Sequence, residues 1–392
     1  MSDEGLRYFA REKLAPLRDR HLLRTLVPTE RRPLARSRQR SEELISFACN
    51  DYLGLSHHPS VIEASRQATS TYGTGAGASR LISGNNPLYA GLEAALAKLK
   101  GTEDAVVFGS GYLANVGVVP ALAARQDLIL MDELCHACLH AGATLARCRT
   151  FRYRHLDLAE LSELLRKHRT AHRHCLVLTD GVFSMDGDRA PVEELLGICE
   201  AHDAWLMTDD AHGLGVIENG RGSGFVDGRA VRVPLQMGTL SKAVGTYGGY
   251  LCTNADVADL MRNRARSLHY TTGLPPGTLA AATAALELIA TDRDLVRQPL
   301  ERARRFTDRL GLAPPESPIV PLVLGGARRT MRAAAALRDR GFLVGAIRPP
   351  TVSEGASRLR LTFSAVHVPD DVDRLAAAVE ETVSDLEIAA DR

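Results

Sequence analysis

One lysine, Lys242, stands in a loop of small, hydroxylated and flexible residues (237–245) that follows an apolar run. The chain has five lysines against 43 arginines, and the other four, at positions 13, 98, 100 and 167, sit in charged, helix-patterned segments that predict solvated surface. An arginine stays protonated, whereas a lysine amine can lose its proton and attack an aldehyde. Lys242 is therefore a candidate nucleophile, and a surface lysine in a polar loop is the alternative.

Other polar residues follow apolar runs in the same way. An apolar segment ends in Asp209 and Asp210, with His212 close behind, and His136 follows another. A buried carboxylate is costly unless a cation pairs with it, and a protonated pyridine nitrogen would be such a cation. The glycine-rich turn at 108–112 leads into a helix, whose first N–H groups suit a phosphate. A lysine, an Asp/His pair and a phosphate turn are the parts that pyridoxal phosphate requires.

The elements that position these residues form a regular pattern. Helical patterns separate most of the apolar strands, which are predicted at 105–109, 128–131, 149–152, 175–179, 205–208 and 233–238. This alternation is typical of an α/β fold with a mostly parallel sheet, covered by helices on both faces, that binds ligands beyond the carboxyl ends of its strands. We predict an N-terminal segment at 1–45, a large domain at 46–280 and a smaller C-terminal α+β domain at 281–392.

Composition excludes several classes of function. The net charge of +1 argues against a polyanion-binding protein, and the arginine-rich run at 31–40 lacks the aromatic residues of a nucleic-acid surface. No apolar stretch approaches the length of a membrane span, and the N-terminus lacks a signal-peptide pattern. The seven cysteines lie mostly in apolar runs, which predicts reduced thiols in a cytoplasmic protein. We expect no metal, because Cys135 and Cys138 have no second pair at zinc-site spacing.

The chain resembles the α-oxoamine synthases, which are fold-type I enzymes that use pyridoxal phosphate. The resemblance runs from about Phe47 to His367 and includes Lys242 and the segments 50–56, 72–84, 181–188, 209–213, 346–352 and 358–362. It implies a fold-type I transferase fold, pyridoxal 5'-phosphate as cofactor, and a homodimer with active sites at the subunit interface.

The resemblance also implies a role for each matching residue. Lys242 would form a Schiff base with the cofactor and later move the Cα proton. Asp209 would pair with the pyridinium nitrogen and His212 with the ring hydroxyl, while His136 would stack on the ring. Further cofactor contacts would come from Ser184, Thr239, the backbone of Gly111 and Tyr112, and Thr272 reaching the neighbouring subunit's phosphate. The substrate residues would be Arg360, which grips the amino-acid carboxylate, and Thr351, Asn50 and Arg20, with Arg18 as the alternative to Arg20.

The reaction implied is a decarboxylative condensation of L-alanine with pimeloyl-CoA or a pimeloyl carrier protein, as in biotin synthesis. The sequence departs from the family pattern at Asp180, where a glutamate is usual, and at Tyr89, where a histidine is usual. Sister enzymes that use other amino acids or acyl donors are the nearest alternative. A fold-type I aminotransferase and an arginine-rich nucleic-acid-binding protein are more distant ones.

Overall fold

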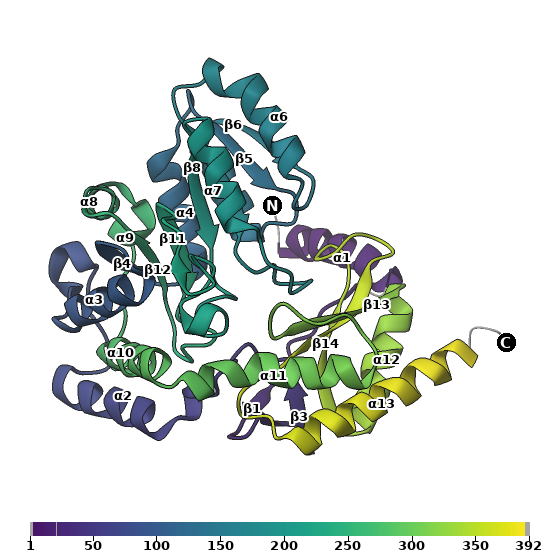
Figure 1. The fold of residues 1–392 in the computed structure, drawn as a ribbon. Coiled ribbons are helices and arrows are strands. Elements are labelled where there is room, and N and C mark those ends of the chain that lie inside the picture. The colour runs from purple at the N-terminus through teal and green to yellow at the C-terminus, as the bar shows by residue number, and fades with distance from the viewer. Residues whose placement is uncertain (1–2, 21, 389–392) are drawn as a thin grey trace. The chain divides into compact units, whose positions relative to one another are not determined.

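The computed structural model describes residues 3–20 and 22–388. The chain divides into two compact units. The larger unit contains residues 50–301 and 315–318, and the smaller one contains residues 1–49, 302–314 and 319–392. Each unit has its own large β-sheet (Figure 1).

The larger unit is built on a seven-stranded sheet in the order β4-β12-β11-β8-β7-β5-β6. Its strands are β4 (Asp104–Phe108), β5 (Leu128–Asp132), β6 (Arg149–Tyr153), β7 (Cys175–Asp180), β8 (Trp205–Asp209), β11 (Leu235–Thr239) and β12 (Gly249–Thr253). All neighbours are parallel except β12, which pairs antiparallel with both β11 and β4. The predicted mostly parallel sheet is confirmed, and β12 is a strand that the sequence pattern did not indicate.

Helices cover both faces of this sheet. The helices of the larger unit, not all of which lie on the sheet, are α2 (Pro59–Tyr72), α3 (Leu88–Lys100), α4 (Gly111–Leu122), α5 (Ala137–Ala146), α6 (Leu158–His168), α7 (Val192–Ala201), α8 (Ala255–Arg264), α9 (Arg266–His269), α10 (Pro276–Thr291) and α11 (Arg293–Arg309), the last continuing into the smaller unit. Single turns occur at η1 (Leu55–His57), η2 (Arg80–Gly84), η3 (Arg169–Ala171) and η4 (Glu218–Gly220), and β9 (Phe225–Val226) pairs with β10 (Arg229–Ala230).

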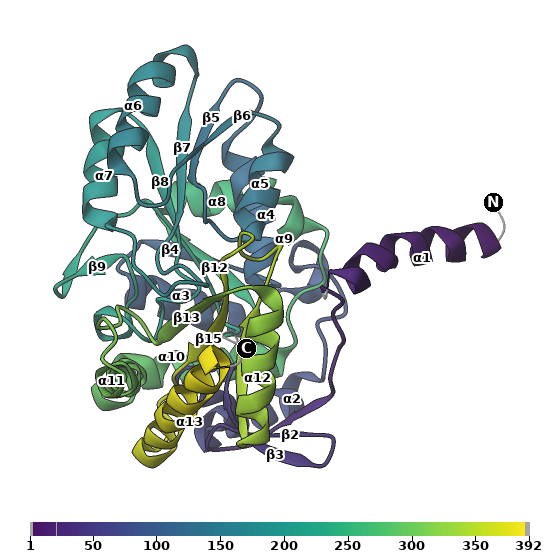
Figure 2. The same cartoon turned by 90° about the vertical axis from the view of Figure 1, so that its right-hand side faces the viewer.

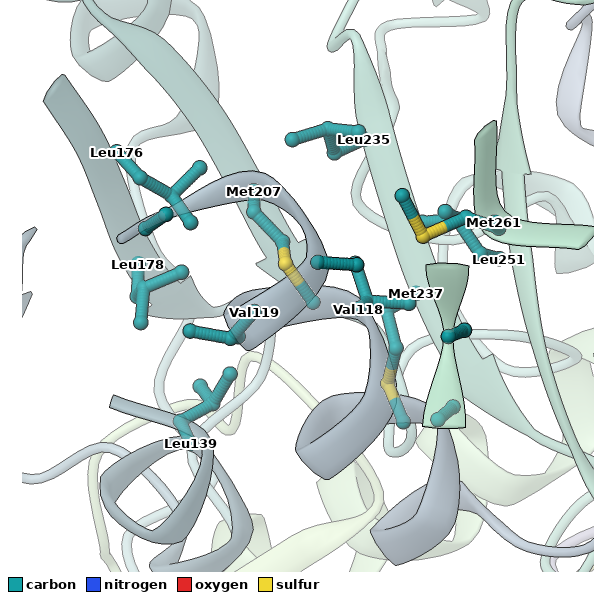
Figure 3. Close-up of a cluster of buried hydrophobic side chains, with 14 of the residues drawn as sticks. Val118, Val119, Leu139, Leu176, Leu178, Met207, Leu235, Met237, Leu251 and Met261 are labelled. Atoms are coloured by element: carbon teal, nitrogen blue, oxygen red, sulfur yellow. The ribbon is translucent and has the colours of Figure 1, made fainter. Parts of the chain in front are cut away.

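Successive strand residues point to opposite faces of the sheet, so the apolar strands supply two separate cores. On β7, Leu176 and Leu178 belong to one apolar cluster with residues of α4, α5 and α8, which Figure 3 shows. Cys175 and Val177, which alternate with them along the strand, pack instead with α6 and α7. Figure 2 shows these two groups of helices on opposite sides of the sheet. Burial on both faces explains why these strands are apolar without interruption.

The smaller unit contains a six-stranded sheet in the order β1-β2-β3-β14-β15-β13. Its elements are α1 (Asp3–Asp19), β1 (Thr29–Arg31), β2 (Arg36–Gln39), β3 (Glu42–Phe47), β13 (Ile319–Gly325), α12 (Ala327–Asp339), β14 (Phe342–Ile347), β15 (Ser357–Thr362) and α13 (Pro369–Ile388). Strand β3 pairs parallel with β14, so the N-terminal segment and the C-terminal part share one sheet. The boundaries between the two compact units therefore differ from the predicted domain limits at 45/46 and 280/281. Those limits remain a prediction about the domains.

The arginine-rich run at 31–40 forms part of this sheet, since Arg36 and Arg38 lie on β2 opposite Ile45 and Glu43 of β3. Within the described ranges, no helix is both long and apolar enough to cross a membrane.

Candidate active site

A cavity of about 240 Å³ lies at the carboxyl ends of the parallel strands in the larger unit. Parallel strands end at the same edge of a sheet, and this edge collects the residues that follow β4, β5, β7, β8 and β11. The cavity is lined by Ser110, Gly111, Tyr112, His136, Cys138, Asp180, Val182, Asp209, Ala211, His212, Met237, Thr239, Ser241 and Lys242. The predicted catalytic residues His136, Asp209, His212 and Lys242 are therefore brought together, as are six of the eight predicted cofactor residues, which are Gly111, Tyr112, Asp209, His212, Thr239 and Lys242.

The loop that carries Lys242 follows β11 and is closed by hydrogen bonds of its own backbone. The amide of Leu240 donates to the carbonyl of Gly248 (3.0 Å), and the amide of Gly245 donates to the carbonyl of Lys242 (2.8 Å). Gly245 has φ +74°, and a Cβ there would lie 2.4 Å from the backbone nitrogen of Ser56, so only glycine fits. This turn holds the lysine at the cavity wall.

His212 and Tyr52 hold the lysine amine in place. Lys242 Nζ lies 2.7 Å from His212 Nε2, and His212 Nδ1 lies 2.7 Å from the hydroxyl of Tyr52. Tyr52 is fully buried, and its hydroxyl also donates to Asn50 Oδ1 (3.3 Å). The tyrosine therefore fixes the imidazole orientation that directs Nε2 toward the amine. Sequence reasoning noted Tyr52 as part of a motif but missed this contact, because it joins positions 160 residues apart.

We expect Tyr52→Phe to lower kcat/KM about tenfold. A buried imidazole nitrogen that loses its hydrogen-bond partner costs about 1–3 kcal/mol of free energy, and about 1.4 kcal/mol on the barrier is a tenfold loss of rate. Steady-state kinetics would measure the loss. Tyr250→Phe is the matched control, since Tyr250 is also fully buried and its hydroxyl has no hydrogen-bond partner among the described residues. Equal effects of the two substitutions would contradict a special role for Tyr52.

Asp209 ends β8 as a buried carboxylate. Its Oδ2 accepts a hydrogen bond from the fully buried Asn115 side chain of α4 (2.7 Å), and its Oδ1 accepts from the amide of Ala211 (3.0 Å). No cationic side chain in residues 3–20 and 22–388 forms an ion pair with it. Burying an ionised carboxylate is costly without a cation, so this oxygen pair suits a positively charged group of a ligand. Asn115 is a second residue that sequence reasoning missed.

The neighbouring Asp210 forms a buried ion pair with Lys100. The prediction that Lys100 is part of the solvated surface was therefore wrong. Lys100 is fully buried, and its Nζ lies 2.6 Å from Asp210 Oδ2 and 2.6 Å from the carbonyl of Arg221. The amide of Ser223 also donates to Asp210 (3.0 Å). The prediction was wrong because Lys100 ends α3 on the buried side of the helix, where a partner distant in sequence neutralises the charge.

His136 is the N-cap residue of α5, and its ring forms part of the cavity wall. Its Nδ1 lies 2.8 Å from Cys138 Sγ, and its amide donates to Asp180 Oδ1 (3.2 Å). Burial lowers the pKa of His136, opposed by the charge of Asp209 and assisted by that of Lys242. Burial also raises the pKa of Asp180 well above its ordinary value, and the charge of Asp209 acts in the same direction. A neutral imidazole at the wall suits contact with a flat ring.

The glycine-rich turn after β4 forms the N-terminus of α4. Ser110 caps the helix by accepting a hydrogen bond from the amide of Leu113 (3.1 Å). The amides of Gly111 and Tyr112 have no acceptor within the helix, so they can bind an anion. A Cβ on Gly111 would lie 3.2 Å from Thr239 Cβ, so any larger residue here would crowd Thr239 at the cavity wall.

The other predicted residues lie outside the cavity lining. In the larger unit, Asn50 accepts from Tyr52, Ser184 lies in the loop after β7, and Thr272 is exposed and bridged to Ser79. The smaller unit contains Arg20, Thr351 and Arg360. Arg20 forms an ion pair with Glu354, and Arg360 is buried on β15. Arg24, which sequence reasoning did not name, donates to the hydroxyl of Thr351 (3.0 Å). The roles of all these residues stay predictions.

Comparisons with known proteins place the chain in a family. The sequence model of aminotransferase class I and II matches residues 42–379. A serine palmitoyltransferase structure from Sphingomonas wittichii superposes with a TM-score of 0.90 at 28% identity, covering 97% of each chain. The chain therefore belongs to the aminotransferase class I and II family, and the predicted fold-type I architecture is confirmed.

Relatives with higher sequence identity show which group within this family the chain belongs to. The 8-amino-7-oxononanoate synthases of Beijerinckia indica subsp. indica and Granulibacter bethesdensis are 55% and 54% identical, covering 95% and 96% of this chain and 96% and 98% of those proteins. A structure of 8-amino-7-oxononanoate synthase from Francisella tularensis has a TM-score of 0.75 at 25% identity, covering 87% of this chain and 98% of that one. Within the family, the chain belongs to the 8-amino-7-oxononanoate synthases, and the resemblance to the α-oxoamine synthases is confirmed.

Proposed function

We propose that this chain condenses L-alanine with a pimeloyl thioester to form 8-amino-7-oxononanoate for biotin synthesis, with pyridoxal phosphate as cofactor. The family of its relatives supports this reaction. The observation that carries the proposal is one cavity that contains the amine of Lys242, just after β11, and the buried carboxylate of Asp209, at the end of the adjacent β8.

The residues of the cavity fit pyridoxal phosphate. The amine of Lys242 suits its aldehyde, and Asp209, which pairs with no cationic side chain among the described residues, suits a protonated ring nitrogen. The first amides of α4, at Gly111 and Tyr112, suit its phosphate. When bound, this cofactor supplies an aldehyde that takes up the amino group of alanine and a ring that accepts the electron pair left by the Cα proton.

Lys242 is the group that moves the proton. With the cofactor bound, this amine would remove the Cα proton of alanine and later return one to the product. His212, held by Tyr52, lies 2.7 Å from this amine and keeps it directed into the cavity. Asp209 would pair with the ring nitrogen of the cofactor and favour its charged form, because its carboxylate is buried and fixed by Asn115.

The bonds changed are those of alanine and the thioester. A carbon–carbon bond joins Cα of alanine to the thioester carbonyl carbon, and the carbon–sulfur bond breaks to release the thiol. The alanine carboxylate leaves as carbon dioxide, and a proton replaces it on Cα. We assign the grip on that carboxylate to Arg360, whose planar guanidinium can bind both oxygens. Thr351 and Asn50 would contact substrate, and Arg20 or Arg18 would meet the distal end of the acyl chain.

The proposal includes a homodimer in the cytoplasm. Thr272 is exposed, which is consistent with its reaching a neighbouring subunit's phosphate. All seven cysteines are free thiols, as suits a reducing compartment.

Thiol release by the purified protein, supplied with pyridoxal phosphate, tests the reaction. We expect release with L-alanine plus pimeloyl-CoA or pimeloyl carrier protein, and none with glycine plus acetyl-CoA. Release with the glycine pair alone would assign the same residues to a sister reaction. If no thioester gives thiol release and the protein transfers an amino group to a keto acid, the activity is that of an aminotransferase and not a condensation.

A further inference from the structure

His155 lies between two carboxylates, outside the residues used above. Its Nδ1 is 3.1 and 3.2 Å from the two carboxylate oxygens of Asp132, and its Nε2 is 2.6 Å from Asp188 Oδ2. The Asp132 side chain is fully buried, whereas those of His155 and Asp188 are 23% and 28% exposed. Ionised carboxylates only accept hydrogen bonds, so both ring nitrogens carry hydrogen and the imidazole is charged.

The protonation of His155 agrees with this geometry. Burial acts against the charged ring, but the hydrogen bonds and charges of Asp132 and Asp188 outweigh it and raise the pKa of His155 to about 10. A ring with both nitrogens protonated and engaged cannot take up a proton from a substrate. His155 is therefore not a general base, and its contribution has to be sought in what it connects.

His155 connects three loops at the edge of the sheet that carries the cavity. Asp132 is the last residue of β5, His155 follows β6, and Asp188 lies in the loop after β7. Asp132 also accepts hydrogen bonds from the amides of Leu134 and Leu156, at 2.8 Å each. One buried carboxylate thus holds the loops after β5 and β6, and His155 joins them to the third.

Two of these loops carry predicted cofactor residues. His136 comes four residues after Asp132, and Ser184 comes four residues before Asp188. The ring of Phe183, next to Ser184, meets the His155 ring edge-on at 4.4 Å. The amide of Phe183 also donates to the carbonyl of Asp188 (3.0 Å), so the loop after β7 closes on itself around the contact.

We propose that His155 is a positioning residue, which ties the loops after β5 and β7 together through Asp132 and Asp188. It thereby holds His136 at the cofactor cavity and fixes the loop that carries Ser184. This inference rests on the proposed function for the identity of the cofactor. It gives a task to a charged histidine that touches neither the cavity nor any group assigned to the reaction.

The test compares His155→Gln with wild-type protein by titrating the apo-protein with pyridoxal phosphate. We expect about 10- to 100-fold weaker binding, the loss that is typical at metal sites when a residue that orients a metal-binding side chain is removed. Hydrogen exchange of the apo-protein should accelerate in residues 133–136 and 183–188 but not in α8. His174→Gln is the matched control, because His174 stacks on Trp205 at the amino ends of the strands (4.8 Å) and should change neither measurement.

Asp188→Asn is a second variant that leaves the buried contact between His155 and Asp132 in place, and it should weaken binding in the same direction. Unchanged affinity and exchange in both variants would overturn the inference, as would exchange that accelerates equally throughout the larger unit, since that would indicate a general loss of stability. A wild-type protein that binds pyridoxal phosphate but releases no thiol would overturn the proposed reaction alone.

Discussion

Lys242→Ala is expected to abolish condensation, with a fall in kcat of more than about 10⁴-fold. General-base catalysis alone typically contributes 10²–10⁴-fold, and this substitution also removes the amine that binds the cofactor covalently. The measurement is thiol release from pimeloyl-CoA with L-alanine. After reduction with borohydride, the peptide that contains Lys242 should carry the cofactor mass in wild-type protein only.

Lys98→Ala is the matched control for this experiment, because Lys98 lies exposed on α3. It should keep wild-type turnover and the modified Lys242 peptide. Normal turnover by Lys242→Ala would refute the assignment of the nucleophile, and cofactor mass on a different lysine would assign the role to that residue.

Lys100→Met is expected to produce the largest loss of stability, about 3–5 kcal/mol in the free energy of unfolding. The side chains of Lys100 and Asp210 are both fully buried, so the substitution leaves the charge of Asp210 without a partner. The midpoint of urea-induced unfolding would measure the loss. Since Asp210 follows Asp209 directly, the same substitution should also reduce retention of pyridoxal phosphate.

Two further variants separate charge from packing. Lys98→Met, on the exposed side of the same helix, should change the free energy of unfolding by less than about 0.5 kcal/mol. Adding Asp210→Asn to the Lys100→Met protein should recover part of the lost free energy of unfolding, because no buried charge is then unpaired. A Lys100→Met protein as stable as wild type would show that the pair contributes little.

Much of the larger unit could be predicted because its strands are buried on both faces. Such strands are continuously apolar, as in β5 and β7. In the helices between them, apolar residues recur with the helical period of about 3.6 residues. Strand β12 escaped prediction because its place in the sheet depends on antiparallel pairing with β11 on one side and with β4, which is distant in sequence, on the other. The pairing of β3 with β14 in the smaller unit joins positions about 300 residues apart and was missed for the same reason.

The amino-acid sequence by itself determined which residues could do chemistry. Lys242 stood out by its type and Asp209 by its place at the end of an apolar strand, and both properties depend on local sequence. Only the tertiary structure decided which residues support them. Three contacts join positions that are 94 to 160 residues apart in the sequence: Tyr52 with His212, Asn115 with Asp209, and Lys100 with Asp210. Hydrogen bonds and ion pairs depend on distance in space, which local sequence patterns do not contain.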